Sequence, residues 1–382
     1  MTITVPFYRH DLRPADAEKI AKVLATPILT SGSVGKAVEA QLAAFFGTRY
    51  AGLTNSWTNG ALAALLAMDI GQGDEVIVPA MTFISSANIA EILGAKPVFV
   101  DVAPDTLLIS LDRMRDAVTE RTRAVIPVHL YGQMVDIRQM KAVLSEMGRP
   151  DIRIIEDSAH CFEGRFDDYG PSAHSDVAIF SFYATKNVAC GEGGAFVTNS
   201  EDLYLKLMQT RLHGMSAGAV DRYQKGHYRH WDMERLGTKA NLPDLLAALL
   251  PDQIATIRDR LSIRQALAAR YESAFRDTPI RIAPVRQEAL SARHIFPIHV
   301  RPAIRDRAIG ILNESGIGVA VNFRSVPTAT YYARKYGYTA ADFPVSYEWG
   351  EGEITLPLFP SMTRAEQDYV IEVVRNKVAP LC

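Results

Sequence analysis

Short, almost wholly apolar segments recur along the first half of this 382-residue chain, most of them followed by a stretch with helical spacing. They predict strands at residues 50–55, 75–79, 97–101, 124–128, 152–156, 177–182 and 196–198. Because these segments are continuously apolar rather than alternating, we expect both faces of each strand to be covered. Repeated strand–helix units of this kind form a mainly parallel sheet between helices. The sequence therefore predicts an α/β protein with three layers.

The pattern changes beyond residue 198. Residues 215–236 are polar and aromatic and have no apolar period, which predicts a long loop. The elements expected after it are a helical stretch at residues 241–275 that Pro251 interrupts, helices at residues 306–314 and 363–377, and strands at residues 283–300 and 316–321. We expect a large domain at residues 1–245, which begins with an irregular arm, and a smaller α+β domain at residues 246–382.

Composition argues against several classes of protein. The chain is 48% hydrophobic and 22% charged, as ordinary globular proteins are, and its net charge of −2 argues against a nucleic-acid partner. Its cysteines (Cys161, Cys190 and Cys382) are too few and scattered for a disulfide framework or a metal site. The sequence has neither a membrane-length apolar run nor an apolar leader at its start, so we expect a cytoplasmic protein without a membrane partner.

A lysine and an aspartate follow two of the predicted strands. Lys186 comes shortly after residues 177–182 and precedes the small residues Cys-Gly-Glu-Gly-Gly, while Asp157 directly follows residues 152–156. Carboxyl ends of parallel strands meet at one edge of a sheet, where α/β proteins bind ligands. Taken alone, Lys186 is more often a surface lysine and Asp157 more often a turn cap. Together they are what bound pyridoxal phosphate requires: an amine for its aldehyde and a carboxylate for its ring nitrogen.

Three further features fall at the same edge of the sheet. The turn at residues 56–60 (Ser-Trp-Thr-Asn-Gly) stands between a strand and a helix, where backbone N–H groups and the helix dipole can hold a phosphate. Ser181 could add a phosphate contact, and Phe83 could stack on the cofactor ring. The alternatives are an ordinary helix cap, a core phenylalanine and a serine bonded to its own backbone. The coincidence of all these features favours the cofactor site.

The segment FSFYATKNVACGEGGAFVTN closely resembles the cofactor-lysine motif of the DegT/StrS family of sugar aminotransferases. Further segments similar to the family are GDEVIVPAMTFISSANIAEILGAKPVFVDV, RTRAVIPVHLYGQMVDI, IIEDSAHCFEG and LPLFPSMT, so the resemblance covers nearly the whole chain. It is strongest to the branch that aminates 4-keto nucleotide sugars, including the 4-amino-4-deoxy-L-arabinose enzyme, because YYARKYGY and GTKANLPD have counterparts there.

The resemblance implies fold type I of the pyridoxal-phosphate enzymes and a role for each matching residue. Lys186 matches the Schiff-base lysine, Asp157 the partner of the pyridine nitrogen and His160 the residue beside the 3-hydroxyl. The other matches are Phe83 as the stacking aromatic, and Trp57, Thr58 and Ser181 as phosphate contacts. Asn241 matches a residue that reaches the phosphate from the partner subunit, which implies a homodimer with shared active sites.

The family's usual reaction implies L-glutamate as donor, 2-oxoglutarate as the released product and a nucleotide-linked keto sugar as acceptor. We take His227, Tyr228 and His230 in the long loop as candidate substrate contacts; the histidine pair lacks the further ligands that a metal needs. The other candidates are Asn322, Phe323 and Arg324.

Two departures from the family pattern bear on the substrate. Many relatives have histidines in the segment that matches residues 321–328, where this chain has Asn322 and Pro327. Trp57 is bulky where relatives usually have a small residue. The resemblance implies amino-sugar synthesis for a lipopolysaccharide, an O-antigen, another surface polysaccharide or a secondary metabolite.

Four alternatives remain beside a 4-keto-sugar aminotransferase. A 3-keto-sugar or cyclitol aminotransferase of the same family is the closest. A family dehydratase would carry histidine in place of Lys186, and a non-catalytic pyridoxal-phosphate-binding regulator would not need the Lys186–Asp157 pair. A nicotinamide oxidoreductase would need a glycine fingerprint that the predicted strands lack.

Overall fold

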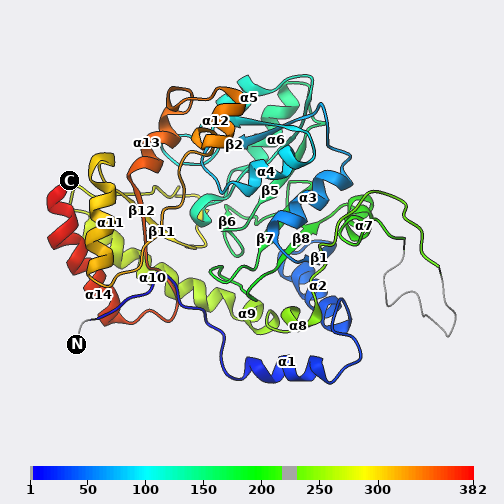
Figure 1. Cartoon of the computed structure of the whole chain (residues 1–382), viewed down its shortest axis with the longest axis horizontal. Helices are drawn as coiled ribbons and strands as arrows, with labels where there is room; N and C mark the ends of the chain where they lie inside the picture. The colour runs from blue at the N-terminus through cyan, green and yellow to red at the C-terminus, as the bar shows by residue number, and fades with distance from the viewer. Residues whose placement is uncertain (1–2, 217–229) are drawn as a thin grey trace.

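The computed structural model describes residues 3–216 and 230–382, and its centre is a sheet of seven strands in the order β1-β8-β7-β5-β4-β2-β3 (Figure 1). The strands are β1 (Tyr50–Thr54), β2 (Glu75–Pro79), β3 (Lys96–Val100), β4 (Thr122–Val125), β5 (Arg153–Asp157), β7 (Val177–Ser181) and β8 (Gly194–Thr198). Only β8 runs against its two neighbours, and the other pairs are parallel. The predicted mainly parallel sheet is confirmed.

Helices cover both faces of this sheet, and successive residues of one strand face different layers. Val76 and Val78 of β2 pack in a core cluster with residues of α3, α4 and α7, whereas Ile77 packs in another cluster with residues of α5 and α6. The helices of this half are α1 (Asp16–Leu24), α2 (Ser33–Phe46), α3 (Trp57–Ala67), α4 (Ser85–Ile92), α5 (Leu111–Ala117), α6 (Ile137–Glu146) and α7 (Glu201–Thr210). Two-sided burial explains why the strands are continuously apolar.

The C-terminal part has its own small sheet and core. Strands β9 (Arg281–Ile282), β11 (Phe296–His299) and β12 (Glu353–Leu356) form an antiparallel sheet in the order β12-β11-β9. Its helices are α8 (Asp244–Ala247), α9 (Pro251–Ala255), α10 (Ile257–Phe275), α11 (Arg305–Glu314), α12 (Thr330–Tyr336), α13 (Pro344–Gly352) and α14 (Arg364–Val373). Figure 1 shows α11 and α14 at the opposite end of the molecule from α7. The predicted domain boundary at residues 245 and 246 stays a prediction.

Several short elements complete the chain. Strand β6 (Arg165–Phe166) pairs with β10 (Ala289–Leu290). Single turns of helix occur at η1 (Leu130–Gly132), η3 (Pro302–Ile304), η4 (Val326–Thr328), η5 (Ala340–Asp342), η6 (Val374–Val378) and η7 (Ala379–Leu381). Within the described ranges, none of the helices combines the length and the apolar character that a bilayer crossing demands.

The structure corrects three predictions in the C-terminal half and adds one strand. The helical stretch predicted at 241–275 is interrupted at Pro251, as expected, but a second break after Ala255 divides it into α8, α9 and α10. The strand predicted at 283–300 is reduced to β10 and β11. Pro284 lacks the N–H that a strand at this point would need. Residues 316–321 form isolated bridges, Ile317 to Val5 and Ala320 to Thr355, instead of a strand. The sequence reading missed β12, which pairs with β11.

Candidate active site

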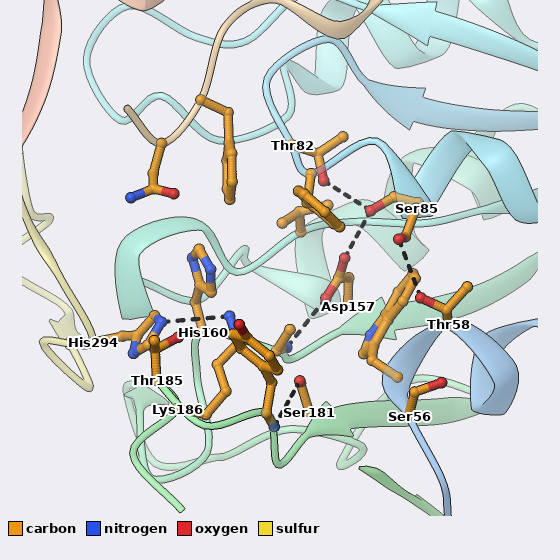
Figure 2. Close-up of a pocket in the computed structure, with 18 of the residues that line it drawn as sticks. Ser56, Thr58, Thr82, Ser85, Asp157, His160, Ser181, Thr185, Lys186 and His294 are labelled. Carbon is orange, nitrogen blue, oxygen red and sulfur yellow. Dashed lines mark hydrogen bonds between the residues drawn. The ribbon is translucent and has the colours of Figure 1, made fainter. Parts of the chain in front are cut away.

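One cavity of about 360 Å³ lies at the carboxyl ends of the central strands (Figure 2). It brings together nine of the predicted residues: Trp57, Thr58, Phe83, Asp157, His160, Ser181, Lys186, Asn322 and Phe323. Most come from the large sheet and its loops, whereas the last two come from the C-terminal part. The sequence prediction that these side chains share one site therefore agrees with the structure.

Lys186 follows β7 and carries its amine into the cavity. Its backbone N–H donates to the Tyr183 carbonyl at 2.9 Å, which closes a turn beyond the end of the strand. The Nζ atom lies 3.4 Å from Nε2 of His294. Burial lowers the pKa of the Lys186 amine to about 8, and the nearby charge of Asp157 opposes this shift. A larger share of the amine is neutral near neutral pH than for an exposed lysine, which favours attack on a carbonyl.

Asp157 ends β5, and its carboxylate is fixed by a hydroxyl in the first turn of α4 and by a backbone N–H just beyond β5. Oδ2 accepts a hydrogen bond from Ser86 Oγ at 2.9 Å, and Oδ1 accepts one from the Ala159 N–H at 3.1 Å. Ser86 is in turn paired with the Thr82 hydroxyl at 2.8 Å. Burial raises the pKa of Asp157, and these hydrogen bonds together with the charge of Lys186 oppose the rise. A protonated ring nitrogen would be a further partner for this carboxylate.

The turn before α3 forms an ordinary helix cap and also leaves backbone N–H groups available to a phosphate. Ser56 caps the helix, since its hydroxyl accepts from the Asn59 N–H at 3.1 Å. Trp57 and Thr58 are the first two helical residues, whose N–H groups helix geometry leaves available to an anion. Gly194 of β8 lies directly against this turn, and a Cβ atom there would be 2.7 Å from the carbonyl carbon of Ser56. A glycine is therefore required for the turn to approach the sheet edge beside Ser181.

Aromatic rings form the wall of the cavity. The Phe83 side chain is 54% exposed, and its ring centroid is 5.8 Å from that of Phe323. The His160 ring stacks on Phe323 at 5.6 Å and lies 4.5 Å from the His294 ring. An exposed phenylalanine at the mouth of a pocket is unusual for a core residue and suits a ring-stacking role.

The residues present fit pyridoxal phosphate. A buried amine, a buried carboxylate and a helix N-terminus surround a cavity of the size common for small-molecule sites. Two buried polar atoms of residues that line the cavity, His160 Nδ1 and Trp57 Nε1, have no hydrogen-bond partner among the described residues. Desolvation and the charge of Lys186 lower the pKa of His160 well below its ordinary value, so its imidazole is neutral. The described part of the chain holds no group of three or more metal-ligating side chains.

Other predicted residues lie away from this cavity, so far as the described chain shows. The Asn241 Nδ2 donates to Ser31 Oγ at 2.8 Å, outside the pocket of its own chain. Arg324 donates through Nε to Glu351 at 2.9 Å on the surface. His230 is exposed and stacks on Trp231. His227 and Tyr228 lie outside the described residues.

Sequence reasoning missed several lining residues. They are Phe7, Thr82, Ser85, Ser86, Thr185, Glu192 and His294. The hydroxyl residues Ser85 and Ser86 could have been found, because they open a helix after a predicted strand. His294 could not, since it precedes β11 in the distant C-terminal part and only folding brings it to Lys186.

Comparisons with known proteins agree with this geometry. A family model described as the DegT/DnrJ/EryC1/StrS aminotransferase family matches residues 10–375. The spore coat polysaccharide biosynthesis protein SpsC from Bacillus subtilis is 37% identical over 369 residues, which cover 95% of this chain and 94% of SpsC.

Solved structures of two proteins are also similar across nearly their whole length. Spr1654 from Streptococcus pneumoniae in its PMP form has a TM-score of 0.91 at 29% identity, with 97% of this chain and 98% of that chain covered. DesV from S. venezuelae has a TM-score of 0.89 at 30% identity, with 98% of both chains covered. Spr1654 is also known in a PLP form, which has a TM-score of 0.89 to this chain at 28% identity and covers 97% of both chains.

Proposed function

Because the chain belongs to the DegT/DnrJ/EryC1/StrS aminotransferase family, whose members are sugar aminotransferases dependent on pyridoxal 5′-phosphate, we propose that it transfers the amino group of L-glutamate to C4 of a nucleotide-linked keto sugar. The observation that carries this proposal is the buried amine of Lys186 beside the carboxylate of Asp157 in one cavity. 2-Oxoglutarate would be the second product.

The residues of the cavity take the following roles in this proposal. Bound pyridoxal phosphate supplies an aldehyde that exchanges amines and a ring that withdraws electrons. Lys186 Nζ holds the cofactor and, once displaced, takes the proton from the α-carbon of the donor. Asp157 keeps the ring nitrogen protonated. The N–H groups of Trp57 and Thr58, together with the Ser181 hydroxyl, bind the phosphate.

His160, Phe83 and the 322–323 segment complete the proposed site. His160 would lie beside the ring hydroxyl, and Phe83 would cover the ring. Asn322 and Phe323 line the cavity on the side of the C-terminal part, so we propose that they contact the sugar. His227, Tyr228, His230 and Arg324 stay proposed substrate contacts, and the assembly would be a homodimer in which Asn241 serves the partner's cofactor.

The product would be an amino sugar for a surface polysaccharide. SpsC takes part in spore coat polysaccharide biosynthesis, as its name states, and this relative supports a polysaccharide pathway more directly than a lipopolysaccharide or O-antigen in particular. We propose a cytoplasmic location, where nucleotide sugars are made.

A labelling experiment tests the proposal. The protein is loaded with pyridoxal phosphate, reduced with borohydride and digested, and we expect the cofactor on the peptide that contains Lys186. The unreduced protein is then given ¹⁵N-glutamate and a panel of UDP-, dTDP- and GDP-linked 3-keto and 4-keto sugars. We expect ¹⁵N at C4 of one product. In Lys186→Ala the rate of ¹⁵N transfer should fall by at least about a thousandfold.

The matched control is Lys141→Ala, which removes an exposed lysine of α6 and should leave the rate unchanged. Label at C3 would redirect the proposal to the 3-keto-sugar reaction. Undiminished transfer by Lys186→Ala, or cofactor recovered on another peptide, would overturn the proposed role of Lys186.

A further inference from the structure

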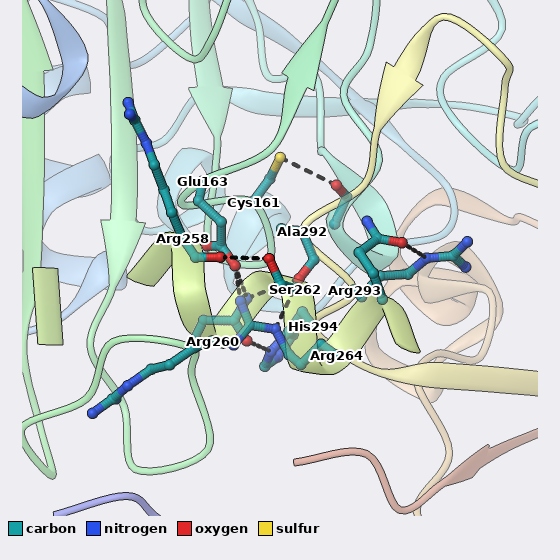
Figure 3. A network of polar contacts seen from close by, with 12 residues as sticks. Cys161, Glu163, Arg258, Arg260, Ser262, Arg264, Ala292, Arg293 and His294 are labelled. Atoms are coloured by element: carbon teal, nitrogen blue, oxygen red, sulfur yellow. Dashed lines mark hydrogen bonds and ion pairs between the residues drawn. The ribbon is translucent and has the colours of Figure 1, made fainter. Parts of the chain in front are cut away.

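A series of hydrogen-bonded polar side chains, all buried except the half-buried Asn187, runs behind the amine of Lys186, away from the cavity. It leads from His294 through Asn187 to an ion pair between Glu163 and Arg264, and Figure 3 shows Glu163, Arg264, Ala292 and His294 gathered there. The inference drawn from this series of hydrogen-bonded side chains rests on the proposed role of Lys186. The similar proteins named above assign no function to His294, Asn187, Glu163 or Arg264.

The Glu163–Arg264 ion pair holds the end of this series that is farthest from Lys186. Both side chains are 1% exposed, and Nη2 of Arg264 donates to Oε1 of Glu163. Arg264 Nε also donates to the Ala292 carbonyl at 3.1 Å. Burial raises the pKa of Glu163, and the charge of Arg264 opposes that rise. A buried carboxylate and guanidinium paired in this way hold one geometry, because breaking the pair would leave an uncompensated buried charge.

The Glu163–Arg264 pair determines the orientation of the side-chain amide of Asn187. Its Nδ2 donates to Glu163 Oε1 at 3.0 Å and to the Ala292 carbonyl at 3.2 Å. Both of these partners are acceptors only, so they require the nitrogen of the amide on their side. The amide oxygen, Oδ1, therefore faces His294, whose Nδ1 is 3.2 Å away.

The amide oxygen in turn determines the tautomer of His294. Asn187 Oδ1 can only accept, so Nδ1 of His294 must carry a hydrogen. Burial and the positive charges of Lys186 and Arg264 lower the pKa of His294 well below its ordinary value, and the ring is neutral. Its second nitrogen, Nε2, then has a free lone pair, and this is the atom 3.4 Å from Lys186 Nζ.

We propose that His294 is a fixed hydrogen-bond acceptor for the amine of Lys186, and that Asn187 and the Glu163–Arg264 pair are positioning residues that set its tautomer. When Lys186 is displaced from the cofactor and protonated, its ammonium group donates to His294 Nε2. This hydrogen bond keeps the amine beside the cofactor between the two halves of the reaction. The proton stays on Lys186, since the pKa of His294 lies well below its ordinary value and the amine is the stronger base.

The acidity of Lys186 in the cofactor-free protein provides a direct test. The pKa is measured from the pH dependence of the rate at which an acylating reagent modifies Lys186, followed by mass spectrometry of its peptide. In His294→Phe the ammonium loses its acceptor, so we expect a Lys186 pKa about one unit lower than in the wild type. The other titratable groups facing the amine, Asp157 and His160, are unchanged in this variant.

His299→Phe is the matched control, because it removes another buried histidine, which pairs with the Glu348 carbonyl, stacks on Trp349 and is not part of the cavity lining. We expect it to leave the Lys186 pKa unchanged. A folded His294→Phe protein with the wild-type Lys186 pKa would overturn the proposal. The borohydride peptide of the preceding experiment reports separately on whether Lys186 holds the cofactor, so the two failures are distinguishable.

Two further measurements keep the test decisive if His294→Phe does not fold. In the wild-type protein, ¹⁵N chemical shifts of labelled histidine should show a neutral His294 with hydrogen on Nδ1, assigned from the spectrum of His294→Gln. Hydrogen on Nε2 would overturn the proposal. Asn187→Ala removes the acceptor of Nδ1–H, and we expect it to lower the Lys186 pKa in the same direction by a smaller amount.

Discussion

Burial of the Lys186 amine lowers the free energy of unfolding of the cofactor-free protein. Burial favours the neutral form and lowers the pKa to about 8, whereas an unfolded chain has a lysine pKa near 10.4. Between these two values the unfolded state binds more protons than the folded state. The free energy of unfolding therefore rises as the pH rises from about 8 to about 10.5. Below pH 8 the full cost is present.

Lys186→Met should therefore stabilise the cofactor-free protein at neutral pH. We expect the free energy of unfolding to rise by about 3 kcal/mol at pH 7, because the variant no longer buries an ammonium group. The gain should shrink when urea unfolding is repeated at pH 9 and at pH 10. Lys141→Met on the exposed side of α6 is the control. An equal gain at every pH would show that burial of the charge is not the cause.

Individual site residues could be predicted from the sequence where they follow a predicted strand. Lys186 and Asp157 were found in this way, because a buried strand seldom ends in a charge without a reason. His294 and Ser86 were not, because their roles depend on contacts over long sequence distances: His294 meets Lys186 across 108 residues and Ser86 meets Asp157 across 71. A single sequence does not encode such contacts in any local pattern.

One carboxylate joins two helices that are distant in the sequence. Helix α2 begins after Gly32 without a side-chain cap of its own. Asp244, at the start of α8, instead accepts hydrogen bonds from the N–H groups of Gly32 and Gly35 at 2.9 Å and of Val34 at 3.1 Å. A Cβ atom on Gly32 would lie 2.5 Å from Oδ2 of Asp244, so glycine permits this approach. The carboxylate is thus the N-cap of a helix in another part of the chain.

Asp244→Ala should destabilise the protein by about 3 kcal/mol, because it leaves three N–H groups of one buried turn without their charged acceptor. Urea unfolding at pH 7 measures the change. Asp244→Asn is the graded control: it keeps one acceptor oxygen and should lose less. A loss below about 0.5 kcal/mol in the alanine variant would mean that water replaces the carboxylate and that the remote cap contributes little.

Helices and strands could be predicted where one pattern of apolar residues dominates the segment. Strand β2 matches its predicted residues because five consecutive buried residues have no other interpretation. A helix was also predicted from residue 363, where Thr363 and Glu366 form a reciprocal capping box at the start of α14. Strand β12 was missed because its residues, Glu353–Leu356, include a charged and a hydroxyl side chain that are buried. Those polar residues satisfy each other only after folding, since Thr355 donates to Glu353.

Three separate parts of the chain meet at Lys186. The large sheet supplies the residue itself, and the C-terminal part supplies His294, Asn322 and Phe323. The N-terminal arm adds Phe7 to the cavity wall, and the Tyr8 hydroxyl donates to the Lys186 carbonyl at 3.1 Å. The site therefore exists only in the complete fold, although most of its residues lie in the first half of the chain.

The position of Asn241 suggests that the site also needs a residue from a second subunit. Asn241 is buried beside Ser31 and Thr30, whose hydroxyl groups accept hydrogen bonds from its Nδ2, and it lies outside the cavity of its own chain. The family resemblance implies that this asparagine binds the phosphate of the partner's cofactor. On this proposal, each active site combines Lys186 of one subunit with Asn241 of the other.

Subunit mixing tests the shared site. Lys186→Ala and Asn241→Ala homodimers should both be impaired, the second mainly through weaker cofactor binding. In the mixed dimer of the two variants, one site combines both substitutions and the other has neither. We therefore expect purified mixed dimers, carrying different affinity tags, to regain about half of the wild-type rate, since one of two sites is intact. If each site instead used residues of a single chain, every site in the mixed dimer would carry one defect and its activity would stay at the average of the two parents. Recovery to half can arise only when the two residues of one site come from different chains.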